Sequence, residues 1–195
     1  MIFLVGAGES RKRRRNARFK EAVFREVILL RVVIVSDTHI PKRAKRLPSA
    51  LIRGLERADA ILHAGDWVDE AVIEELEAYA PVYGVAGNCD PPELRRRLGE
   101  RRIVRLGGYR IGLVHGEGRK GTTLERAIAA FAGEPLHLLV FGHTHLPYKG
   151  RHGNTLVFNP GSPTDRRRSP RFSYGVALLG KRGIRVRHVW FSSRE

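Results

Sequence analysis

The sequence predicts an α/β fold with a mainly parallel first sheet and a mixed second sheet. Between residues 31 and 90, short apolar runs alternate with segments of helical periodicity, as in parallel strands joined by right-handed crossovers. Beyond residue 100, apolar runs flank the pair Gly107-Gly108, which indicates a hairpin. A chain of 195 residues with 42% hydrophobic residues is long enough to bury the core of one such domain.

Each element is predicted from its own pattern. Short continuous runs of aliphatic residues indicate buried strands, and apolar side chains that recur on one face indicate helices. In the first half we expect strands over 32–35, 60–64 and 82–86, and helices over 48–57 and 70–79. In the second half we expect a helix over 122–131 and strands over 103–106, 110–114, 136–141, 155–158, 174–179 and 184–190.

Residues that commonly bind metals follow the predicted strands. Each is an Asp, Asn or His at or just beyond the end of an apolar run: Asp37, His39, Asp66, Asn88, His115, His143 and His145. In open α/β sheets, ligands bind at the carboxyl ends of the strands. In the segment Gly142-His143-Thr144-His145, alternate side chains share a face, so both imidazoles point into one cavity. An isolated His-x-His would be interpreted as a surface pair, but the other strand ends argue against that here.

The mixture of carboxylate, amide and imidazole groups suits divalent ions of intermediate hardness, such as Mn, Fe, Zn or Ni. Seven ligands are too many for one ion but suit two, with one carboxylate between them. Two ions about 3.5–4 Å apart clamp an in-line displacement at phosphorus and generate hydroxide near neutral pH. The pattern therefore predicts a hydrolase of phosphate esters.

Five motifs occur together along the chain: Asp37-x-His39, Gly65-Asp66, Gly87-Asn88-x-Asp90, His115-Gly116 and Gly142-His143-x-His145. Their order and spacing resemble those of the calcineurin-like metallophosphoesterases over about residues 31–190. The segment 159–162, Asn-Pro-Gly-Ser, is similar to a feature of the small bacterial and archaeal phosphodiesterase branch of that superfamily. The resemblance implies a four-layer αββα sandwich in which two mixed sheets are flanked by helices.

The resemblance also implies a role for each candidate residue. It assigns Asp37, His39 and His145 to a first ion, Asn88, His115 and His143 to a second, and Asp66 to both. Asp66, Asn88 and His115 are the catalytic candidates, and Mn is the expected metal, with Ni, Fe and Zn as alternatives. Asp90 is expected to hold the Asn88 loop from behind the ligands.

Cys89 marks a departure from the larger phosphoesterases of the superfamily, which carry at this position a His thought to protonate the leaving group. A thiol does not replace an imidazolium as a general acid at neutral pH. We expect Cys89 to be a packed thiol, because the sequence offers no activating base. His63 either supports the site or is an ordinary strand residue, and Trp67 either lines the pocket or packs beneath the loop.

Residues 1–30 look unlike the domain predicted over 31–195. They carry the basic run 11–15, which we interpret as part of a dispensable extension; a nucleic-acid or membrane-surface arm is the alternative. The net charge of +16 attracts anions such as phosphate esters. Basic residues follow most ligand loops, either as a positive rim or because the chain is rich in arginine. The single cysteine and the lack of an apolar run of about 20 residues lead us to expect a cytoplasmic protein without a membrane partner.

The expected function is that of a phosphodiesterase whose substrate is a phosphate ester, for example a nucleotide-like one. One rival is a non-catalytic interaction scaffold like the retromer subunit of the same fold, which the intact ligand set argues against. Another is a nuclease, but the chain is too short for the capping domain of such enzymes and lacks a His at 89. Sequence-specific nucleic-acid binding is not expected, since the aromatic residues do not interleave with the cations. The sequence leaves homo-oligomer formation open.

Overall fold

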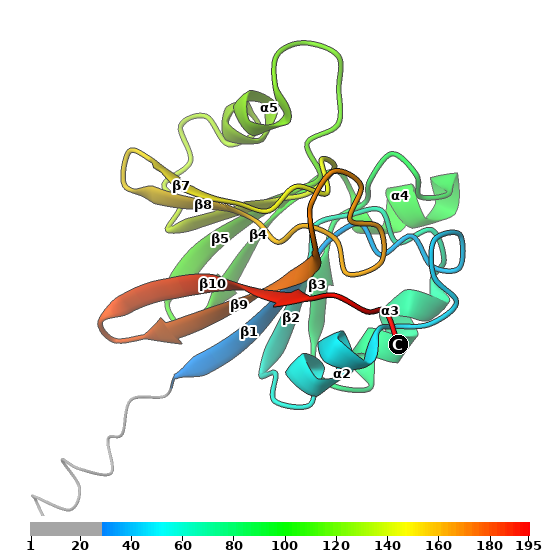
Figure 1. Cartoon of the computed structure of the whole chain (residues 1–195). Coiled ribbons are helices and arrows are strands. Elements are labelled where there is room, and N and C mark those ends of the chain that lie inside the picture. Colours follow the sequence, from blue (N-terminus) through cyan, green and yellow to red (C-terminus); the bar gives the residue numbers. More distant parts are fainter. Residues whose placement is uncertain (1–28) are drawn as a thin grey trace, which may run out of the picture.

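The computed structural model describes residues 29–195, in which two five-stranded sheets face one another (Figure 1). The first sheet has the order β10-β9-β1-β2-β3, with β1 (Leu30–Val35), β2 (Ala60–His63), β3 (Val82–Gly84), β9 (Phe172–Gly180) and β10 (Gly183–Phe191). The second has the order β4-β5-β6-β8-β7, with β4 (Arg101–Leu106), β5 (Tyr109–Val114), β6 (Leu138–Phe141), β7 (Tyr148–His152) and β8 (Thr155–Asn159). The extension predicted over 1–30 lies outside the described residues except for its last two.

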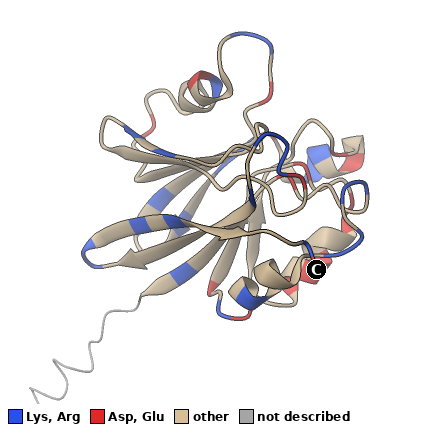
Figure 2. Ribbon diagram, in the orientation of Figure 1, with Lys and Arg blue, Asp and Glu red and all other residues tan. Residues whose placement is uncertain are grey.

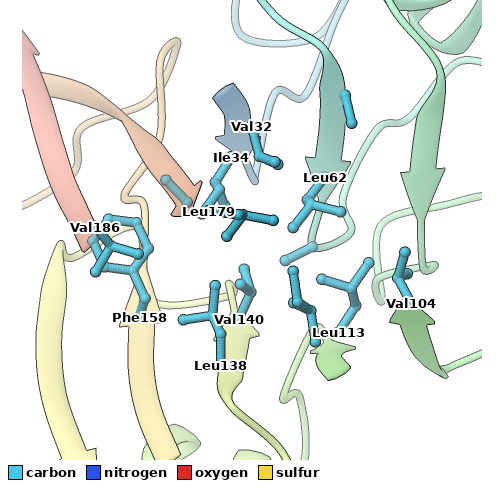
Figure 3. Packing of buried hydrophobic residues seen from close by; sticks show 14 of the residues in the cluster. Val32, Ile34, Leu62, Val104, Leu113, Leu138, Val140, Phe158, Leu179 and Val186 are labelled. Carbon is cyan, nitrogen blue, oxygen red and sulfur yellow. The ribbon is translucent and has the colours of Figure 1, made fainter. Parts of the chain in front are cut away.

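The main core lies between the two sheets, where aliphatic side chains of both inner faces interdigitate (Figure 3). Along β1, Val32 and Ile34 point into this core, whereas Val33 and Val35 pack on the outer face of the sheet. The strand is therefore buried on both faces, which explains why its sequence is a continuous apolar run. Leu138 and Val140 of β6 face Val32 and Ile34 from the second sheet.

Helices cover the outer face of each sheet and complete the four layers. The first sheet is covered by α2 (Ser49–Leu55) and α3 (Ala71–Glu77), whose buried side chains form a second apolar cluster with β1. The second sheet is covered by α5 (Thr123–Ala129), which begins with a capping box between Thr122 and Glu125. The αββα sandwich with two mixed sheets is thus confirmed. The prediction of a mainly parallel first sheet was wrong, because β9 and β10 join it as antiparallel strands beside β1.

Strand register brings the predicted ligand loops to one edge. In the first sheet β1, β2 and β3 run parallel, with Val35 opposite His63 and His63 opposite Gly84. In the second sheet β5 and β6 run parallel, with Val114 opposite Phe141. The loops after these strands therefore leave the two sheets side by side, at the carboxyl ends where α/β folds place their sites.

Two elements were not predicted. The helix α4 (Pro92–Leu98) has only Leu94 buried, so it lacks the apolar face that identifies a helix from sequence. The strand β7 is a mostly exposed edge strand with the polar sequence Tyr-Lys-Gly-Arg-His, which gives no alternating pattern. Among residues 29–195, no helix has both the length and the apolar character needed to cross a membrane.

Candidate metal centre

Backbone strain marks the loops at the carboxyl ends of the strands. Five of the seven candidate ligands have positive φ angles: Asp37 (56°), His39 (45°), Asp66 (61°), His143 (69°) and His145 (60°). Non-glycine residues rarely adopt this left-handed conformation, and each instance costs about 1–3 kcal/mol. Such strain persists where the surrounding structure fixes it, and it clusters at functional sites.

Asp37, His39 and His145 form one compact group. The Nε2 atoms of His39 and His145 lie 3.2 Å apart, and the Nε2 of His145 lies 3.2 Å from Asp37 Oδ1. One ligand atom from each of the three side chains lies within 4.8 Å of the other two, as in a group that could hold a metal ion. All three residues are buried, so water competes little for these atoms.

Asp66 lies between this group and His115. Its Oδ2 is 3.5 Å from His39 Nε2 and 3.3 Å from His115 Nε2. Asp37, Asp66 and His115 form a second group with all ligand atoms within 4.8 Å, so Asp37 borders both groups. The Asp66 carboxylate is held by the backbone N–H of Cys89, which donates to Oδ1 at 2.8 Å.

Asn88 and His143 meet beside His115. The Nδ1 of His143 lies 3.0 Å from Asn88 Oδ1, and the His143 ring stands edge-on to that of His115 with centroids 5.1 Å apart. The structure thus brings all seven sequence-predicted residues together. The Sγ of Cys89 also lies within 4.8 Å of ligand atoms of His39 and Asp66, a position that the sequence did not suggest.

Polar atoms of the cluster are available to bind cations. Among the described residues, Asp37 Oδ1 and His115 Nε2 are buried without any hydrogen-bond partner, which is costly unless another group satisfies them. Burial favours the neutral form of Asp37, but the close His145 imidazole and the charge of His115 outweigh it and lower its pKa. Burial likewise opposes charge on His115, yet the Asp66 carboxylate, with Oδ2 at 3.3 Å, and the charge of Asp37 raise its pKa to about 9. The donor set therefore fits divalent metal ions.

Backbone carbonyl groups orient two of the histidines. His115 Nδ1 lies 2.8 Å from the carbonyl oxygen of Ala64, and His145 Nδ1 lies 2.5 Å from that of Asp165. A carbonyl oxygen only accepts, so in each ring Nδ1 is the donor. Each Nε2 therefore faces the cluster, and the neutral ring with its proton on Nδ1 is the tautomer that a metal ligand needs.

Several supporting residues have no clear signal in the sequence. Ser36 donates to Asp37 Oδ2 at 2.6 Å, and Ser162 donates to the Asp37 carbonyl oxygen at 2.7 Å. Asn159 donates to the Gly142 carbonyl oxygen at 2.8 Å, so the motif at 159–162 ties the Asp37 loop to the Gly142 loop. Only that motif offered a clue, because Ser36 and Asp165 act through contacts that depend on the fold.

Asp90 links the loops that carry Asp66 and Asn88. Its Oδ2 accepts hydrogen bonds from the backbone N–H groups of Gly87 at 2.7 Å and Asp66 at 3.2 Å, and its Oδ1 accepts one from Val68 at 2.7 Å. Asp90 is buried, and both of its carboxylate oxygens accept hydrogen bonds from backbone N–H groups. It therefore holds the geometry of the loops.

His63, Trp67 and Cys89 surround the cluster without belonging to the predicted set. The His63 ring stacks on Trp67 with centroids 3.5 Å apart and contacts Thr38 Oγ1 at 3.1 Å, and burial lowers its pKa to about 3. Trp67 is fully buried and donates to the Val85 carbonyl oxygen, so it packs beneath the loop. Burial, together with the hydrogen bond and charge of Asp66, raises the pKa of the Cys89 thiol to about 11.

Comparison with known proteins identifies the family. A sequence profile of the calcineurin-like phosphoesterase superfamily domain matches residues 30–181. A probable metallophosphoesterase from Methanothermobacter thermautotrophicus is 37% identical over 137 residues, which cover 67% of this chain and 76% of that protein. The chain therefore belongs to the calcineurin-like phosphoesterase superfamily.

Solved structures agree on the fold. Vacuolar protein sorting 29 from Cryptosporidium parvum superposes with a TM-score of 0.66 and 24% identity, covering 85% of this chain and 99% of that one. The structure of an archaeal phosphodiesterase superposes with a TM-score of 0.61 and 21% identity, covering 83% of this chain and 100% of that one. At these identities the likeness concerns the fold alone.

Proposed function

We propose that this member of the superfamily hydrolyses phosphodiesters with two divalent metal ions held at the strand ends. The observation that carries the proposal is the convergence of seven polar side chains on one edge, where Asp37 Oδ1 and His115 Nε2 are buried without a partner among the described residues. Asp37, His39 and His145 would hold one ion, Asn88, His115 and His143 the other, and Asp66 both. Mn suits this mixed oxygen and nitrogen set.

The residues of the chain provide positioning. Bound divalent ions would supply positive charge for the phosphoryl oxygens and lower the pKa of water, which suits phosphate ester hydrolysis. The carbonyl groups of Ala64 and Asp165 accept from Nδ1 of His115 and His145, so in each ring Nε2 is the atom left to bind an ion. Ser36 and the backbone N–H of His143 both donate to Asp37 Oδ2, which leaves Oδ1 directed at the cluster. Preorganisation of this kind avoids rearrangement during the reaction.

Metal content and ester preference test the proposal. After reconstitution with excess Mn, we expect two ions per chain by inductively coupled plasma mass spectrometry, and faster hydrolysis of bis(p-nitrophenyl) phosphate than of p-nitrophenyl phosphate. His145→Ala should lose one ion, whereas His152→Ala, an exposed histidine on β7, should keep both. A single ion per chain in the wild type would contradict the two-metal arrangement. Two ions without hydrolysis of either ester would point to a non-catalytic scaffold.

The leaving group gives a separate prediction. Cys89 occupies the position of a general acid, but a thiol does not protonate the leaving group at neutral pH. Esters with good leaving groups such as nitrophenolate should therefore react far faster than alkyl esters, whose leaving groups need a proton. Cys89→Ala should keep aryl diester hydrolysis within about threefold, and Cys89→His should narrow the gap between aryl and alkyl esters. The measurement is kcat/KM for both substrates together with metal content. Loss of aryl hydrolysis in Cys89→Ala with both ions retained would make the thiol a participant in the reaction.

A further inference from the structure

A basic pocket lies next to the candidate metal centre. Its volume is about 610 Å³, and it is formed by the turn after His39, the loop after β8, the start of β9 and residues 192–195. Figure 2 shows Lys and Arg, in blue, on these segments near the C-terminus. Five basic residues and one acidic residue line the pocket: Arg43, Lys45, Arg46, Arg166, Arg194 and Glu195.

Two of these cations are held in place by an aromatic ring and by backbone groups. The guanidinium groups of Arg166 and Arg194 lie 5.9 and 5.6 Å from the centre of the Phe172 ring. Arg166 also donates to the Ser169 carbonyl oxygen at 3.1 Å, and Arg194 to that of Thr164 at 3.2 Å. Cations held in this way lose little conformational freedom when an anion binds.

The positive charge of the pocket is poorly neutralised. Of its five cations, only Arg43 has a carboxylate within 4.0 Å in the described part of the chain, namely Asp165 at 3.4 Å. By contrast, Arg95 contacts two glutamates and Arg110 contacts Glu134. Like charges that gather without counter-charges repel one another, and a bound anion relieves that repulsion. The pocket therefore has the chemistry of an anion site, and guanidinium groups match the geometry of phosphate and carboxylate, of which phosphate is the group that a phosphate ester carries.

Direct contacts connect the pocket to the candidate metal centre. The backbone N–H of Arg43 donates to the His39 carbonyl oxygen at 2.8 Å, and its side chain pairs with Asp165, whose carbonyl oxygen accepts from His145. The arginines that follow Asp165 extend the connection. Arg166 lines the basic pocket, whereas Arg167 and Arg168 line a second hollow of about 360 Å³ that includes His143.

Arg167 brings positive charge next to His143. Its Nη1 donates to the His143 carbonyl oxygen at 3.2 Å, and its backbone has a positive φ of 43°. Its Nε lies 3.9 Å from Asp165 Oδ2, the carboxylate that also pairs with Arg43, so consecutive arginines connect the hollow at His143 with the basic pocket. Four of the other loop cations are used elsewhere: Arg95, Arg96 and Arg97 pair with glutamates, and Lys149 donates to the Val186 carbonyl oxygen.

We infer that the basic pocket binds a further phosphate group of the substrate, beyond the ester that is hydrolysed. This inference rests on the proposed function and names its substrate class: diesters that carry at least one additional phosphate. Such a substrate places its reacting phosphate at the hollow beside His143 and its extra phosphate among Arg43, Arg166 and Arg194. A diester without the extra phosphate leaves the basic pocket unused.

A matched pair of charge reversals tests the pocket. Lys45→Glu/Arg46→Glu alters two exposed side chains of the pocket, and Lys181→Glu/Arg182→Glu makes the same charge change on the exposed β9–β10 turn, away from the C-terminus in Figure 1. In metal-free protein, calorimetric titration with tripolyphosphate should show affinity lowered about tenfold or more in the pocket variant, because charge-assisted contacts are lost. The turn variant should change less than about twofold, since exposed distant charges are screened. Lys45→Ala/Arg46→Ala, with thermal unfolding of every variant, controls for folding.

Kinetic measurements then test whether the basic pocket binds a phosphate group of the substrate. The p-nitrophenyl ester of thymidine 5′-phosphate is compared with the same ester carrying a 3′-phosphate, so the leaving group is identical. The wild type and the turn variant should prefer the 3′-phosphorylated ester in kcat/KM, and the pocket variant should lose that preference while hydrolysing the simpler ester at the wild-type rate. Equal losses in both variants, or a preserved preference in the pocket variant, would overturn the inference. Pocket-dependent tripolyphosphate binding without any hydrolysis would count against the proposed function and support the anion site.

Discussion

Asp66→Asn should abolish turnover and remove most of the bound metal. The Asp66 Oδ2 atom lies between His39 Nε2 and His115 Nε2, at 3.5 and 3.3 Å, so this carboxylate borders both proposed ion positions. The amide that replaces it keeps an acceptor for the Cys89 N–H but lacks the negative charge. Loss of residues behind metal ligands costs about 10–100-fold, and loss of a shared ligand should cost roughly 10³-fold or more in kcat/KM.

Asp69→Asn is the matched control for this variant. It makes the same chemical change three residues along the chain, at an exposed side chain that accepts a hydrogen bond from the Ala71 N–H. This control should keep both ions and wild-type kcat/KM. Metal content and kcat/KM are measured on both variants after Mn reconstitution, with the melting temperature of the metal-free proteins as a check on folding. Retention of both ions and more than about a tenth of the activity in Asp66→Asn would show that Asp66 does not bridge.

The strands and helices that have a clear apolar pattern could be predicted from the sequence. Val32 to Val35 form a continuous apolar run because β1 is buried on both faces, and the same holds for the runs that end before Gly65 and Gly142. Parallel register then places the ends of these strands at one edge, so the candidate ligands could be grouped without knowing a single distance. The helix α4 and the edge strand β7 could not be found this way, because little of either is buried.

The contacts that support the candidate ligands could not be predicted from the sequence. Ser162 donates to the Asp37 carbonyl oxygen across 125 positions, and Asp165 accepts from His145 through a backbone oxygen that any residue would supply. The left-handed conformations of Asp37 and His145 also depend on these tertiary contacts and not on residue type. The basic pocket has the same origin, because its walls come from residues 43–46, 166–172 and 192–195, three stretches that are distant along the chain.

Gly142→Ala should disturb both stability and the metal centre. A Cβ atom at this position would lie 1.9 Å from Ser36 Oγ and 2.9 Å from both Asp37 Oδ2 and the Ala64 carbonyl oxygen. The backbone cannot easily retreat, because the Gly142 N–H donates to the His115 carbonyl oxygen and its own carbonyl oxygen accepts from Asn159. The free energy of unfolding should therefore fall by about 1–3 kcal/mol, as in other overpacked cores. Displacement of Asp37 should lower kcat/KM by about 10²-fold, because small misplacements at a site are costly.

Two variants separate crowding at the site from a general effect of alanine. Gly153→Ala lies on the β7–β8 turn, where a Cβ atom has no neighbour within 4 Å among the described residues and only the positive φ of 55° is strained. It should cost about 1 kcal/mol in chemical denaturation and leave kcat/KM unchanged. In the double variant Ser36→Ala/Gly142→Ala the closest clash is removed, so part of the lost stability should return as a favourable coupling free energy. Wild-type stability and activity in Gly142→Ala would contradict this prediction. The loops at Asp37 and Gly142 would then not pack as closely as the structure places them, and the strained loops would tolerate displacement without loss of the site.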